Sequence, residues 1–92
     1  MSEPVLTPGK WITLRQLHPL KPRKTEVYAI HPKDGSAPIG TIEWHSPWRG
    51  YAFFPLPNTV FEPDCLGTII DWLKTLNQHH RQQLKARKEA HE

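Results

Sequence analysis

The stretch that decides the fold is residues 62–76, EPDCLGTIIDWLKTL, where an apolar pattern with helical spacing begins beside a proline. Pro63 suits the first position of a helix, and Glu62 and Asp64 place acidic groups where the helix dipole favours them. One broad face of this helix carries Cys65, Leu66, Ile69, Ile70, Trp72, Leu73 and Leu76. Because no proline follows residue 63, we predict one uninterrupted helix over about 63–88.

The chain before this helix is divided into short strand-like runs, since all ten prolines lie at or before residue 63. Four runs rich in β-branched and aromatic residues predict strands over 11–17, 25–31, 39–45 and 51–54. Asp34-Gly35 predicts a hairpin between the second and third strands. Pro47 predicts a turn between the third and fourth, with Gly50 in the left-handed position.

These elements predict an α+β fold, in which an antiparallel sheet of three or four strands is packed on one face by one long C-terminal helix. With 92 residues we expect a single domain over 11–92, preceded by a flexible N-terminal arm over 1–10. The predicted core is Ile12 or Trp11, Leu14, Tyr28, Ile30, Ile42, Trp44, Phe53 or Phe54, Leu66, Ile69, Ile70, Leu73 and Leu76.

The overall composition limits the function without identifying it. The formal net charge of +3 permits a polyanionic partner but is too small to single out a nucleic-acid binder. Cys65 is the only cysteine, so an intrachain disulfide is excluded, and we expect a buried, inert thiol. The N-terminus lacks a signal-peptide pattern, and no apolar run is long enough to span a membrane. We therefore expect a cytoplasmic protein.

Neither a cofactor nor a metal site is predicted, because no pair among the six histidines has ligand spacing and Cys65 has no CxxC partner. Glu43 and His45 share a predicted strand face near Arg49, which leaves a small nuclease or toxin as one alternative. No phosphate loop or nucleophile elbow accompanies these residues. We therefore predict that the protein is not an enzyme.

The turn between the third and fourth strands contains the leading candidates for a partner contact. Trp48 and Arg49 lie in this turn and Tyr51 follows it, and these three residue types are enriched at protein interfaces. The predicted helix ends in a basic stripe, and we add its Arg81, Lys85 and Lys88 to this candidate surface. The alternatives to a partner-binding role are that Trp44 simply packs in the core and that the basic end of the helix is only solvated.

Direct binding of nucleic acid is the second alternative for the basic residues. Arg23 and Lys24 lie in a basic loop, and Lys74 and Arg81 lie on the helix, so that together they would contact phosphates. Such binding would weaken steeply with salt, because each phosphate contact releases counterions.

One pattern spans the middle of the chain: an isoleucine–tryptophan strand over 39–44, a Trp48-Arg49 turn, an aromatic strand ending in Phe54-Pro55, and a Cys65-Leu66 helix start. This pattern resembles a small uncharacterised domain encoded by phages and prophages. The resemblance implies a phage accessory or host-takeover protein. We therefore expect a small non-enzymatic module that binds, and modulates or inhibits, a host protein or protein–nucleic-acid complex.

Overall fold

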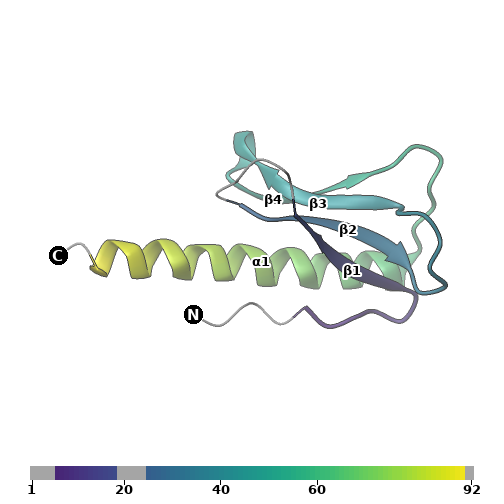
Figure 1. Ribbon diagram of the computed structural model, residues 1–92, viewed down its shortest axis with the longest axis horizontal. Coiled ribbons are helices and arrows are strands. Elements are labelled where there is room, and N and C mark those ends of the chain that lie inside the picture. Colours follow the sequence, from purple (N-terminus) through teal and green to yellow (C-terminus); the bar gives the residue numbers. More distant parts are fainter. Residues whose placement is uncertain (1–5, 19–24, 91–92) are drawn as a thin grey trace.

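A computed structural model describes residues 6–18 and 25–90, with helix side chains described through residue 86. The elements are β1 (Ile12–Leu17), β2 (Val27–Pro32), β3 (Gly40–His45), the 3₁₀ turn η1 (Ser46–Trp48), β4 (Gly50–Pro55) and α1 (Pro63–Ala90). The four strands form one antiparallel sheet in the order β1-β2-β3-β4, and α1 lies along one face of it (Figure 1). The predicted α+β fold is therefore confirmed.

Pairing in the sheet fixes which side chains face the helix. Ile42 lies between Tyr28 and Phe53 in neighbouring strands, and Trp44 pairs with Tyr51. Paired residues share a face of the sheet, and this face packs against α1. The buried core consists of Ile12, Tyr28, Ile30, Ile42, Tyr51, Cys65, Ile69, Trp72 and Leu76. The partly buried Leu14, Trp44, Phe53 and Leu73 pack around it.

Two helix residues predicted in the core are in fact exposed. Leu66 is 43% exposed and Ile70 is 49% exposed. Both lie at one side of the broad apolar arc, whereas Ile69, Trp72 and Leu76 lie toward its other side and are buried. The prediction was wrong because the sheet covers a narrower arc of the helix than the apolar pattern suggests.

The N-terminal segment over residues 6–10 packs against the helix. The Trp72 Nε1–H donates a hydrogen bond of 2.9 Å to the Thr7 carbonyl, and Leu6 packs against the core. A Cβ added to Gly9 would lie 2.7 Å from the Thr68 side chain, so glycine permits this close approach. Within the predicted arm over 1–10, residues 6–10 therefore contact the helix and the core, residues 1–5 lie outside the described part, and the flexibility of the arm stays a prediction.

The C-terminal part of α1 projects past the sheet (Figure 1). At 1.5 Å per residue, its 28 residues span roughly 42 Å, close to the 48 Å longest dimension of the molecule. Leu84, on the projecting part, is exposed. In the described ranges 6–18 and 25–90, no helix has both the length and the apolar character to cross a membrane.

Candidate binding surface

The turn between β3 and β4 is built from a 3₁₀ turn and one residue in a left-handed conformation. Pro47 is the second residue of η1, and the Arg49 N–H donates to the Ser46 carbonyl at 3.1 Å. Arg49 has φ 50° and ψ 49°, a region that costs a non-glycine residue free energy. The prediction that Gly50 takes the left-handed position is therefore wrong, since Arg49 takes it.

Gly50 is required here for a different reason. A Cβ at this position would lie 3.1 Å from Asn77 Oδ1 of the helix. The same Asn77 oxygen accepts a 2.7 Å hydrogen bond from the Tyr51 N–H at the outer edge of β4. The absent side chain at Gly50 thus lets the helix amide reach the edge strand, which fixes the turn relative to the middle of α1.

Trp48 stands out on this turn, because 78% of its surface is exposed. Its ring packs edge-on against the His45 ring, with 4.8 Å between the ring centroids. The His45 ring also packs edge-on against the Phe54 ring, with 5.7 Å between the centroids. His45 and Phe54 lie on the sheet face opposite α1, because they alternate with Trp44 and Phe53 of the core face. We call His45, Trp48 and Phe54 the aromatic patch.

Tyr51, predicted as a partner contact, belongs to the core. It is buried, and its ring packs edge-on against the Trp44 ring, with 5.6 Å between the ring centroids. Its hydroxyl accepts a 3.1 Å hydrogen bond from the Glu26 N–H. Alternation along β4 explains the correction, because Tyr51 pairs with Trp44 and so faces the helix.

The predicted basic residues are placed only in part. Arg81 and Lys85 are exposed on α1, whereas the side chain of Lys88 and the loop residues Arg23 and Lys24 lie outside the described part. Lys74 is also exposed. Arg81 lies one helical turn beyond Asn77, so it adjoins the end of the sheet where the β3–β4 turn lies.

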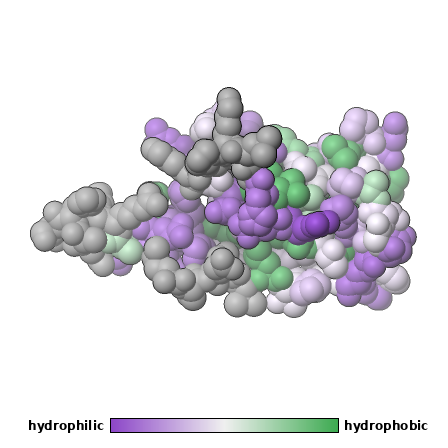
Figure 2. Space-filling model, in the orientation of Figure 1, coloured by the Kyte–Doolittle hydropathy of each residue, from purple (hydrophilic) through white to green (hydrophobic). Residues whose placement is uncertain are grey.

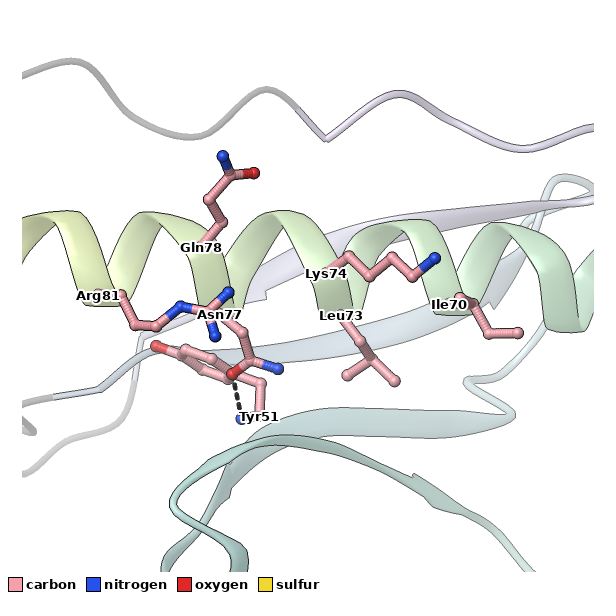
Figure 3. A pocket seen from close by; sticks show the side chains of 7 residues that line it. All are labelled: Tyr51, Ile70, Leu73, Lys74, Asn77, Gln78 and Arg81. Atoms are coloured by element: carbon pink, nitrogen blue, oxygen red, sulfur yellow. Dashed lines mark hydrogen bonds between the residues drawn. The ribbon is translucent and has the colours of Figure 1, made fainter.

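A groove runs between α1 and the edge strand β4, with a volume of about 500 Å³ (Figure 3). Its lining is Tyr51, Ile70, Leu73, Lys74, Asn77, Gln78 and Arg81. Lys74 and Arg81 were predicted as basic contacts, but the groove itself was not predicted. The sequence carries no signal for this groove, because the exposure of Ile70 depends on how wide an arc of α1 the sheet covers.

The contacts give no support to catalysis by Glu43 and His45 or to a metal site among the described residues. The His45 ring packs against Trp48 and Phe54, and Glu43 accepts a 3.4 Å hydrogen bond from the Thr41 hydroxyl. Within residues 6–18 and 25–90, no three His, Cys, Asp or Glu side chains gather where they could hold a metal ion.

The helix start explains the state of the cysteine. Burial raises the pKa of the Cys65 thiol, and the hydrogen bond and negative charge of Glu62 raise it further. The Cys65 N–H donates to Glu62 Oε1 at 2.6 Å, and this bond lowers the pKa of the Glu62 carboxyl. A buried thiol with a raised pKa is a poor nucleophile, so Cys65 is structural.

Comparison with known proteins finds a small phage protein. The chain is 37% identical over 60 residues to the uncharacterised 9.3 kDa protein of Acholeplasma phage L2, covering 65% of this chain and 77% of the phage protein. The chain belongs to the family of that phage protein. No family model matches the sequence, and no solved structure matches the fold. The predicted resemblance to small phage proteins is confirmed at this level, and the relative's description assigns no activity.

Proposed function

We propose that this protein is a non-enzymatic, cytoplasmic binding module of phage or mobile-element origin, which engages and modulates a host protein through the aromatic patch. The observation that carries the proposal is the 78% exposure of Trp48 on a turn. Burying an indole on binding contributes a large apolar area, which is why tryptophan is enriched among the residues that dominate binding energy.

The conformation of the turn supports the proposal. Pro47 restricts the backbone before Trp48, and Gly50 lets Asn77 fix the residue that follows the turn. His45 supports one edge of the indole. A side chain held in place before binding loses less conformational entropy when a partner covers it.

The left-handed Arg49 is a second supporting observation. Strained backbone at a non-glycine residue persists where the surrounding structure imposes it, and such residues cluster at functional sites. A glycine at residue 49 would adopt this conformation without the steric cost. The position of Arg49 beside Trp48 favours a contact made by its guanidinium, which suits hydrogen bonding at protein interfaces.

The test is capture from a host-cell lysate with the tagged full chain, in the presence of nuclease and with low-salt and then high-salt washes. Trp48→Ala is compared with Trp11→Ala, because Trp11 is also an exposed tryptophan, at 53%, but lies outside the patch beside Lys10. We expect one protein to be retained at high salt and to fall at least about tenfold with Trp48→Ala only.

Two results would contradict the proposal. Equal recovery of the same protein by wild type and Trp48→Ala would remove the aromatic patch as the contact. Recovery of nucleic acid alone when nuclease is omitted, with its loss at high salt, would favour the direct nucleic-acid binder instead.

A further inference from the structure

The groove between α1 and β4 is a second surface with its own chemistry, separate from the aromatic patch. Two features of its lining point to a ligand: apolar side chains that are not fully used by the core, and cations placed beside them. Figure 3 shows Leu73 and Tyr51 between the helix and β4, with Ile70 and Arg81 toward opposite ends of the drawn stretch.

The apolar part of the groove leaves contact area available. Ile70 is 49% exposed, although it lies beside the partly buried Leu73. A partner side chain that covered Ile70 would remove apolar surface from water, which is favourable at roughly 25 cal/mol per Å². Sugar and phosphate would gain little from such a surface, so the groove favours a protein ligand.

The edge of β4 limits how a protein ligand enters. Asn77 Oδ1 already accepts the outward Tyr51 N–H at 2.7 Å, and the strand ends at Pro55. A peptide that added itself as a fifth strand would have to displace the Asn77 amide from this bond. A ligand that binds through side chains alone avoids that cost, as a helix does when it lies in a groove.

The charges of the groove define the ligand further. Lys74 and Arg81 are both exposed and lie seven residues apart, so their Cα atoms are separated by roughly 10.5 Å along the helix axis. Among the described residues that line the groove, there is no carboxylate to neutralise them. Residues seven apart on a second helix lying alongside would have the same spacing.

We propose that this groove binds an amphipathic helix of a partner protein, which places an apolar side chain on Ile70 and Leu73 and acidic side chains two turns apart against Lys74 and Arg81. The inference extends the proposed binding function to a second contact surface, and its test does not depend on the aromatic patch.

The test uses the full chain and three synthetic helical peptides of about 20 residues, long enough to hold a helix. One carries Leu on one face with Glu pairs seven residues apart, and the others replace Glu by Gln or by Lys. Binding is followed by fluorescence anisotropy, and the contact is mapped by amide chemical-shift changes. We expect the acidic peptide to bind at least about tenfold more tightly than the Gln peptide and to shift the amides of 70–81.

Matched variants locate the contact. Lys74→Glu combined with Arg81→Glu should weaken the acidic peptide at least about tenfold, and Ile70→Ala should weaken it about threefold or more. Lys33→Glu reverses an exposed charge in the β2–β3 connection, outside the groove, and should alter affinity less than about twofold. Trp48→Ala should leave this affinity unchanged. Circular dichroism checks that each variant is folded.

Several outcomes would overturn the inference. Equal binding of the acidic and Gln peptides, no binding of the acidic peptide, or equal weakening by Lys33→Glu would each contradict a charge-matched groove. Tighter binding of a single-stranded DNA 20-mer through Lys74 and Arg81 would assign the groove to nucleic acid. Loss of host-protein capture in Trp48→Ala alone, without peptide binding, would retain the proposed function and reject the groove.

Discussion

The helix–sheet core and the β3–β4 turn each hold a prominent tryptophan, and the two are in opposite situations. Trp72 is 2% exposed, packs within the core, and donates its indole hydrogen to Thr7. Trp48 is 78% exposed and contacts His45 at its edge. The same residue type is therefore structural in the core, at Trp72, and available for binding in the β3–β4 turn, at Trp48.

The largest expected effect is in the core. Trp72→Ala should lower the free energy of unfolding by about 3–5 kcal/mol, because it leaves a cavity and an unpaired Thr7 carbonyl. Urea denaturation followed by circular dichroism measures this loss. Trp48→Ala is the matched control and should change the same quantity by less than about 0.5 kcal/mol. Similar losses in both variants would break the comparison between the two regions.

The next largest effect is expected at Asn77, whose hydrogen bond to the Tyr51 N–H connects the helix to the β3–β4 turn. Asn77→Ala should lower the free energy of unfolding by about 1–2 kcal/mol, since the part-buried Tyr51 N–H loses its acceptor. Asn77→Asp keeps an acceptor oxygen and should lose no more than about half as much. A neutral Asn77→Ala variant would show that the helix does not hold the turn in place.

A change in the turn should have the opposite sign. Arg49→Gly should raise the free energy of unfolding by about 0.5–1 kcal/mol, because glycine relieves the left-handed strain more than it adds chain entropy. Arg49→Ala keeps the strain and should stay within about 0.5 kcal/mol of wild type. If Arg49→Gly also loses the captured host protein, stability and binding oppose each other at this residue. If Arg49→Gly instead lowered the free energy of unfolding, the left-handed conformation of Arg49 would not be a source of strain.

The smallest effect is expected at the start of the helix, because the Glu62 side chain is exposed. The hydrogen bond from the Cys65 N–H lowers the pKa of the Glu62 carboxyl in the folded protein. The ionised carboxylate therefore contributes its full stabilisation above the unfolded-state pKa of about 4.3. This stabilisation is lost as pH falls through the lower pKa of the folded state. The stability difference between wild type and Glu62→Gln should therefore shrink as pH falls below about 4. Thermal melts across this range check it, and a constant difference would contradict the assignment.

Most of the fold could be predicted because each element had a local signal. The four strand ranges agree with the observed strands to within two residues, and the helix begins at the predicted Pro63. Proline spacing, strand alternation and the acidic helix start depend only on neighbouring residues. The packing of residues 6–10 could not be predicted, because it depends on Trp72, 65 residues further along the chain from Thr7.

The candidate surfaces were less predictable for the same reason. Exposure of Trp48 followed from its place in a turn, but the burial of Tyr51 depended on the pairing register with Trp44. The groove depended on how wide an arc of α1 the sheet covers, which the apolar pattern alone overestimates at Leu66 and Ile70. Which strand lies at the edge, and which helix amide reaches it, are properties of the assembled fold.

The order of elements along the chain has a consequence for biosynthesis. All four strands are complete by Pro55, whereas the helix that covers their apolar face begins at Pro63 and runs to Ala90. During translation the residues of all four strands therefore leave the ribosome before the helix that covers them, and residues 6–10 can pack against Trp72 only after Trp72 has been made. A chain released before the helix is finished would expose Ile30 and Ile42 to solvent and would be prone to aggregate.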